Sequence, residues 1–112
     1  MAEKQAVFKT AKLWQWLTET GTKNKQAYPK YLKEIAYAIE DCPVCNFYRE
    51  ETSKGCKKCP VGNNGNDICL QQDSTFKKWL YSTEEVDTKH YAEIIFKRLK
   101  IYYKNEFGGR IR

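Results

Sequence analysis

The stretch CPVCNFYREETSKGCKKCP, residues 42–60, holds four of the five cysteines in this 112-residue chain. It contains two Cys-x-x-Cys pairs, Cys42 with Cys45 and Cys56 with Cys59, with ten residues between the pairs. Two thiolates at this spacing can bind one Zn²⁺ from a tight turn, and a second pair completes a tetrahedron of ligands. The stretch therefore predicts a structural zinc site with these four cysteines as ligands.

Two other uses of paired cysteines compete with zinc. Disulfides need an oxidising compartment, and the N-terminal sequence MAEKQAVFKTAKLW lacks the apolar segment of a secretion signal. CPVC alone is similar to a dithiol redox site, but such sites follow a strand, whereas here CPVC follows the helix-like stretch YLKEIAYAIED. The second pair has no redox role. Reduced cytosolic thiols in two pairs are more typical of metal ligands.

The fifth cysteine, Cys69, has two interpretations. A free cysteine is commonly a small buried apolar residue. Cys69 also lies only ten residues after Cys59, so it could replace Cys56 or Cys59 in the ligand set. We predict the four paired cysteines as ligands and keep Cys69 as the reserve.

Apolar residues at helical spacing lie on both sides of the cysteine stretch. They predict a helix over residues 4–20, a second that opens at Pro29, a third over residues 73–81 and a last one over about 83–107. Hydrophobic residues make up 41% of the chain, which is enough for a packed core. The predicted fold class is mostly α: a small helical domain, residues 1–112, with a central four-cysteine zinc knuckle or ribbon insert at about 42–69.

The sequence also predicts several helix ends and faces. Gly21 is a stop signal for the first helix, and Asp73 or Ser74 is expected to cap the third. Ser82 and Glu85 have the spacing of a capping box at the start of the last helix. The buried faces of the second and last helices are expected to contain Leu32, Ile35, Ala36 and Ile39, and Tyr91, Ile95, Leu99 and Tyr102, respectively.

The net charge of +6 is concentrated near the C-terminus. Lys97, Lys100 and Lys104 share one face of the predicted last helix, where they could neutralise phosphates of a nucleic acid. The alternative is an ordinary solvated face, in which Glu93 pairs with Lys97 one helical turn later. Both interpretations stay open. Lys57 and Lys58, beside the cysteines, offer a second basic surface.

The chain has few features of an enzyme or a membrane protein. It contains one histidine, the loop GNNGND lacks the patterns of a phosphate-binding loop, and four thiolates around zinc leave no open position for a substrate. The apolar runs are too short to span a membrane, and the positive charge excludes a DNA mimic. We expect a non-enzymatic cytoplasmic binding protein.

The cysteine pattern resembles that of a group of small phage and prophage proteins. The order is CP-x-C, an aromatic-bearing spacer, C-x-x-CP, a Gly/Asn loop, a further cysteine, and an aromatic residue followed by Trp. These positions are Cys42–Cys45, Phe47 and Tyr48, Cys56–Pro60, Cys69, Phe76 and Trp79. The resemblance covers about forty residues. It implies a stoichiometric modulator of host nucleic-acid machinery, such as an anti-CRISPR inhibitor of a CRISPR-Cas effector.

Two function classes follow from these observations. In the first, the protein binds a host nucleic-acid-processing protein and inhibits or modulates it, with zinc stiffening the scaffold. In the second, it binds DNA or RNA directly through the basic C-terminal helix. The first class is our prediction, and the second is the alternative.

Overall fold

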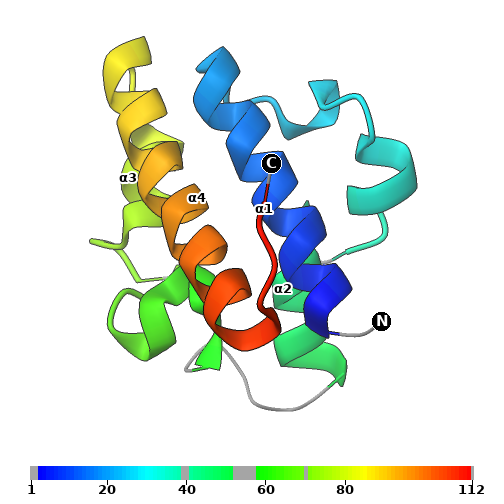
Figure 1. Cartoon of the computed structure of the whole chain (residues 1–112). Helices are drawn as coiled ribbons and strands as arrows, with labels where there is room; N and C mark the ends of the chain where they lie inside the picture. The colour runs from blue at the N-terminus through cyan, green and yellow to red at the C-terminus, as the bar shows by residue number, and fades with distance from the viewer. Residues whose placement is uncertain (1–2, 39–40, 52–57, 70, 112) are drawn as a thin grey trace.

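A computed structural model of the chain describes residues 3–38, 41–51, 58–69 and 71–111 (Figure 1). Helices predominate in this described part, which contains no strand, so the predicted mostly α fold class is confirmed. The α-helices are α1 (Glu3–Thr20), α2 (Pro43–Cys45), α3 (Thr75–Tyr81) and α4 (Glu85–Phe107). Shorter helical turns are η1 (Lys25–Ala27), η2 (Tyr31–Ile35), η4 (Asn46–Glu51) and η6 (Pro60–Gly65).

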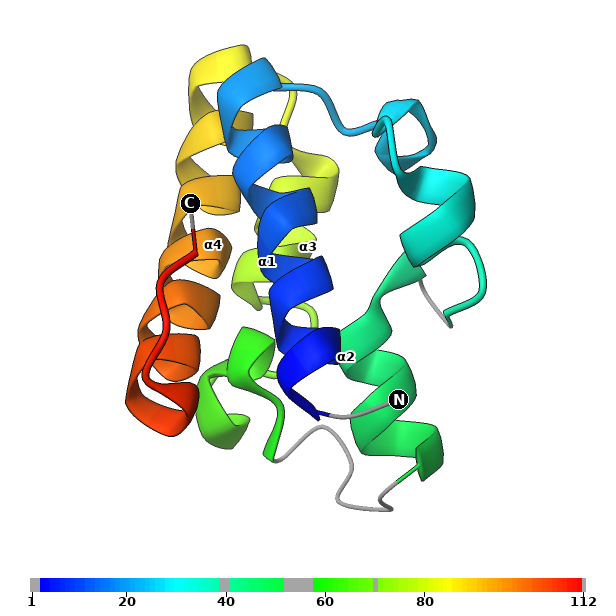
Figure 2. The same ribbon diagram turned by 45° about the vertical axis from the view of Figure 1, so that its right-hand side comes forward.

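The core lies between α1 and α4, which run side by side (Figures 1 and 2). Each helix has an apolar residue every three or four positions, so its buried side chains line one face. They are Val7, Ala11, Trp14 and Leu17 on α1 and Ala92, Ile95, Leu99 and Tyr103 on α4. Helix α3 covers this pair through Trp79, which is 1% exposed. None of the helices described here is long and apolar enough to cross a bilayer.

Helix α1 matches its prediction closely. It begins at Glu3 and ends at Thr20, and the Gly21 N–H donates to the Leu17 carbonyl at 3.0 Å. Gly21 has φ +71°, a left-handed conformation that ends helices at little cost only when the residue is glycine. The predicted stop is therefore confirmed.

Helix α4 begins at Glu85, and the predicted capping box at its start is wrong. Ser82 instead ends α3: its hydroxyl donates to the Trp79 carbonyl at 2.7 Å and lies 2.6 Å from the Thr88 hydroxyl. The connection between α3 and α4 is short, and the Ser82 side chain is engaged at the end of α3. Ser82 therefore cannot also cap the start of α4.

The predicted buried face of α4 is wrong at Tyr102. Tyr103, four residues after Leu99, is 7% exposed, whereas Tyr102 is half-buried. The Tyr102 hydroxyl donates to Glu3 Oε2 at 2.9 Å and lies 3.0 Å from the Tyr48 hydroxyl. Tyr102 therefore joins α4 to the start of α1 and to η4 by polar contacts.

The predicted second helix is only the single wide turn η2. Ile35 is buried, but Leu32 is 87% exposed and Ala36 is exposed, so they do not share a buried face. Ile39 lies outside the described residues. The turn is closed by the Ala36 N–H, which donates to the Tyr31 carbonyl at 2.8 Å, and the Tyr31 hydroxyl donates to Asp41 Oδ1 at 2.9 Å. Ile35 is the one buried residue of this turn, so the turn itself gains little packing energy from helix formation.

Helix α3 begins as predicted, with Ser74 as its cap. The Ser74 hydroxyl accepts the Lys77 N–H at 3.1 Å. Asp67 adds a second contact, because its carboxylate accepts the Thr75 N–H at 3.0 Å and the Thr75 hydroxyl. The same carboxylate lies 2.7 Å from the guanidinium of Arg98 on α4.

Arg98 also donates to the Val61 carbonyl at 3.1 Å, so the Asp67–Arg98 ion pair joins η6, α3 and α4. Burial raises the pKa of Asp67, but hydrogen bonds from Thr75 and Arg98 outweigh it and leave this pKa below its ordinary value. A carboxyl group with a lowered pKa contributes stability above its unfolded pKa, about 4, and loses it as the pH falls through the folded pKa.

We expect Asp67→Asn to lower the free energy of unfolding by about 1–3 kcal/mol at neutral pH, because the amide cannot pair with Arg98. The difference from the unchanged protein should shrink as the pH falls below about 4, where Asp67 becomes protonated in both states. Urea unfolding at several pH values measures this. Asp73→Asn, at an exposed position nearby, is the matched control. A constant difference between pH 7 and pH 3 would contradict the expectation.

Candidate metal centre

Two turns with the sequence Cys-Pro-Val begin at Cys42 and Cys59. Cys42 immediately precedes α2 and Cys59 immediately precedes η6, and a proline occupies the first helical position of each. Proline fits there because the first helical N–H has no partner within the helix. The two cysteines are 6% and 4% exposed. Two separate segments therefore present a buried thiol in the same local setting.

Backbone N–H groups at the same two positions, two and three residues ahead, act on the pKa of both cysteines. The Cys45 thiol lowers the pKa of Cys42 most, and the N–H groups of Cys45 and Val44 lower it further. Burial raises the pKa of Cys59, and the N–H groups of Gly62 and Val61 act in the opposite direction. Such donors favour a thiolate over a thiol, and a thiol must lose its proton to bind a metal.

The described thiols form one electrostatic cluster. The Cys45 thiol donates to the Cys42 sulfur, and this bond, with a contribution from Lys25, lowers the pKa of Cys42 to about 7 although burial opposes it. Donation of the same proton raises the pKa of Cys45, and burial raises that of Cys59. Cys45 and Cys59 both interact with Cys69. Cys42, Cys45, Cys59 and Cys69 thus lie near one another.

The first turn is held by Thr10, which is fully buried on α1. Its hydroxyl donates to the Ala6 carbonyl at 2.8 Å and accepts the Val44 N–H at 3.1 Å. Sequence reasoning missed Thr10, although its place between the apolar residues Val7 and Ala11 was a signal of burial. The bond fixes the Cys42 turn against the central helix.

The second turn and Cys69 are held by the segment before α3. The Asp67 N–H donates to the Gly62 carbonyl at 2.9 Å, and the Ser74 hydroxyl donates to the Cys69 carbonyl at 2.8 Å. Asp67 itself is fixed by Thr75 and Arg98, as described above. Packing between η6 and α3 therefore sets the position of Cys59 and Cys69.

A lysine that the sequence did not single out lies beside the thiols. The Lys25 ammonium group is 5.3 Å from the ring centroid of Trp14, 5.4 Å from that of Phe76 and 5.8 Å from that of Trp79. An ammonium group over aromatic faces is stabilised by the ring quadrupoles. Lys25 thereby places a positive charge near Cys42, where thiolates would concentrate negative charge.

Three predicted ligands, Cys42, Cys45 and Cys59, and the reserve Cys69 are close enough to influence one another's pKa. The other predicted ligand, Cys56, lies outside the described residues. Within the described ranges, no three Cys, His, Asp or Glu side chains are arranged so that they could hold a metal ion.

The predicted basic residues fall into separate places. Lys97 pairs with Glu93 at 2.9 Å, as the solvated-face interpretation expects, while the Lys100 ammonium lies 5.9 Å from the ring centroid of Phe96. Lys104 and Lys58 are exposed, and Lys57 lies outside the described residues. Lys100 and Lys104 line a cavity beside the C-terminal tail, residues 108–111.

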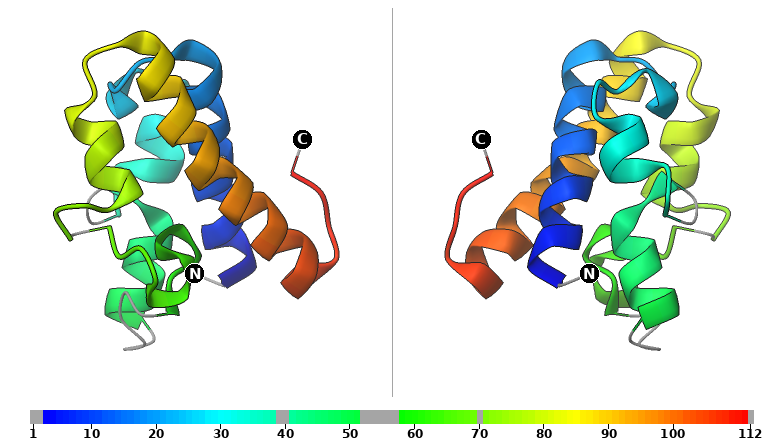
Figure 3. Two further views of the ribbon diagram at one scale, coloured as in Figure 1. Left: turned by 90° about the vertical axis from the view of Figure 1, so that its left-hand side faces the viewer. Right: turned by 90° about the vertical axis from the view of Figure 1, so that its right-hand side faces the viewer.

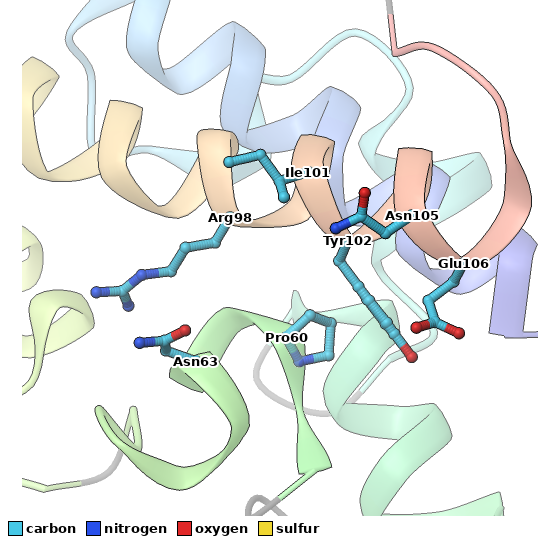
Figure 4. Close-up of a pocket in the computed structure, with 7 residues that line it drawn as sticks. All are labelled: Pro60, Asn63, Arg98, Ile101, Tyr102, Asn105 and Glu106. Atoms are coloured by element: carbon cyan, nitrogen blue, oxygen red, sulfur yellow. The ribbon is translucent and has the colours of Figure 1, made fainter.

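A different cavity, of about 300 Å³, lies between α4 and η6 (Figure 4). Pro60 and Asn63 line it from η6, opposite Ile101, Tyr102 and Glu106 on α4. Arg98 also lines this cavity, but its guanidinium is already engaged by Asp67 and Val61. Lys58 precedes Cys59 at this side of α4, whereas Lys100 and Lys104 line the cavity at the tail side. The two predicted basic surfaces are therefore not one surface.

Comparison of the chain with protein-family models, with curated proteins and with solved structures finds no match.

Proposed function

We propose that this chain is a non-enzymatic, zinc-stabilised binding protein. The observation that carries the proposal is the pair of Cys-Pro-Val turns, each of which begins with a buried cysteine immediately before a short helix. Two such sulfurs, together with two further thiols, supply the four soft ligands that Zn²⁺ prefers. Four thiolates close the coordination sphere, so the metal would stiffen the scaffold rather than bind a substrate.

Three of the proposed ligands are Cys42, Cys45 and Cys59, and the fourth is Cys69. Support for Cys69 comes from its electrostatic interaction with Cys45 and Cys59 and from its carbonyl bond to Ser74. Cys56, which the sequence pattern favours, is the alternative fourth ligand. Lys25 would partly neutralise the two excess negative charges of zinc bound by four thiolates.

Purified protein is expected to contain about one zinc ion per chain, the number that four thiolates hold. Cys42→Ser and Cys59→Ser should each remove most of it, and Cys69→Ser should remove more than Cys56→Ser, which is the matched control. Elemental analysis and titration of accessible thiols measure this. Folded protein without metal would contradict the zinc site. Loss of zinc from Cys56→Ser, with zinc kept by Cys69→Ser, would contradict Cys69 as the fourth ligand.

The proposed action is stoichiometric binding to a macromolecule. The resemblance to phage proteins supports a host nucleic-acid-processing complex as the partner, such as a CRISPR-Cas effector. Capture from a nuclease-treated host lysate, followed by titration of the isolated partner, tests this action. Inactivation of an excess of the partner by less than one equivalent of protein would contradict it, because a binding inhibitor cannot turn over.

A second candidate function is direct binding of nucleic acid. The observation that favours it is the cavity lined by Lys100 and Lys104 beside the C-terminal tail. Gel-shift experiments at two salt concentrations separate the two functions, because neutralisation of phosphates makes affinity fall steeply with salt.

A further inference from the structure

The C-terminal tail turns back beside α4 (Figure 3). A cavity of about 380 Å³ that is open to solvent lies between the two. Lys100 and Lys104 line it from α4, and Gly109, Arg110 and Ile111 line it from the tail. Three cations from two segments thus face one space. None of the described residues that line this cavity is acidic.

The position of Arg110 is set by contacts on both sides of it. The Gly108 N–H donates to the Lys104 carbonyl at 2.9 Å, which starts the turn. Gly109 lies against the Tyr103 ring so closely that an added Cβ would be 2.7 Å from a ring carbon. Ile111 is 4% exposed and packs in the core. These anchors keep Arg110 beside Lys104, so the cavity is built by the fold.

Three cations line this cavity, and the residues that the structure describes form no salt bridge with them. Within the described part of the chain, no carboxylate pairs with Lys100, Lys104 or Arg110, whereas Lys97 on the same helix pairs with Glu93. Like charges held close together repel one another, and a bound anion relieves that repulsion. Guanidinium and ammonium groups together match the several oxygens of a phosphate.

A second cavity, of about 510 Å³, lies on the α1 side of Tyr103. Lys4 and Lys9 line it with Phe8, which is 38% exposed, and with one acid, Glu34. Tyr103 lines this cavity and contacts Gly109 of the first one, so the two cavities are neighbours. Cations that alternate with an exposed aromatic ring are the arrangement that binds single-stranded nucleic acid, through phosphates and stacked bases.

We propose that the cavity between α4 and the tail binds one phosphate group of a single-stranded nucleic acid. The strand would continue across Tyr103 toward Lys4 and Lys9, with Phe8 available to stack a base. This inference rests on the second candidate function above and gives it a surface. It does not require zinc, because the proposed zinc ligands lie in other segments of the chain.

The test uses the full chain as purified, with fluorescein-labelled oligo(dT) and oligo(U) as probes and inorganic phosphate as competitor. Arg110→Ala and Lys104→Ala are expected to weaken oligonucleotide binding about tenfold, the value of one charge-assisted hydrogen bond. The slope of log affinity against log salt should fall by about one in each variant. Lys97→Ala, whose lysine is on the same helix but pairs with Glu93, is the matched control and should bind within about twofold of the unchanged protein.

Gly109→Ala distinguishes a built pocket from diffuse positive charge. It keeps the net charge, but the added Cβ would force either the tail or the Tyr103 ring between the two cavities to shift, so it should weaken binding as much as Arg110→Ala. Unchanged binding by Gly109→Ala, equal losses in all lysine variants including Lys97→Ala, or no binding of either oligonucleotide would each overturn the proposal. Binding to phosphatidylserine vesicles but not to oligonucleotides would overturn it in favour of a lipid phosphate. Zinc content and circular dichroism of the same samples show separately whether the zinc proposal holds and whether each variant is folded.

Discussion

Removal of zinc by a strong chelator is expected to unfold the segment of about residues 42–69 and to lower the free energy of unfolding by several kcal/mol. The physical reason is that buried thiols such as Cys42 and Cys59 gain their stabilisation from the metal, so the binding free energy of the metal is folding free energy. Helices α1 and α4, which pack on each other, should keep part of their circular-dichroism signal. Thermal melting before and after chelation measures the loss.

The control for chelation is re-addition of one equivalent of Zn²⁺, which should restore the original melting temperature. Mg²⁺, which prefers oxygen ligands and binds thiolates poorly, should not restore it. An unchanged melting temperature in fully demetallated protein would show that the thiol cluster contributes nothing to stability. Zinc would then have to be given up as a structural element.

Trp79→Ala is expected to lower the free energy of unfolding by about 3–5 kcal/mol, because it leaves a cavity where a large ring was buried. Trp79 is 1% exposed, and its ring centroid lies 4.7 Å from that of Trp14 in an edge-to-face contact. The Lys25 ammonium group lies over the Trp79 ring, 5.8 Å from its centroid. Urea unfolding monitored by far-UV circular dichroism measures the change.

Tyr81→Ala is the matched control for Trp79→Ala. Tyr81 is an aromatic residue on the same helix but is 70% exposed, so its removal should cost less than about 0.5 kcal/mol. If the two variants were equally stable, α3 would not be packed against α1 and α4 as described. Zinc content of Trp79→Ala provides a second measurement, since α3 positions the segment that carries Cys69.

Regular helices could be predicted from the sequence because their signals are local. Apolar spacing gave the extents of α1 and α4 to within about two residues, and Ser74 gave the start of α3. These features depend on side chains three or four residues apart, which lie together in any helix. No knowledge of the remaining chain was needed for them.

Local signals failed where two elements compete for one residue. Ser82 has the spacing of a cap for α4, yet it ends α3, because the connection between these helices is too short for separate residues. The segment after Pro29 has helical periodicity, yet among the described residues its helical turn ends at Ile35, the one residue of that turn that is buried. In both cases tertiary contacts decided between locally acceptable structures.

The sequence by itself determined the helical class, the main apolar faces and the cysteines that could act together. Only the tertiary structure decided that Cys69 lies with Cys42, Cys45 and Cys59. It also decided that Lys25 stands beside them and that Arg110 joins Lys100 and Lys104. The reason is physical: spacing along the chain fixes which residues share a helix face, but packing of Tyr103, Asp67 and Ile111 against distant segments fixes which helix faces meet.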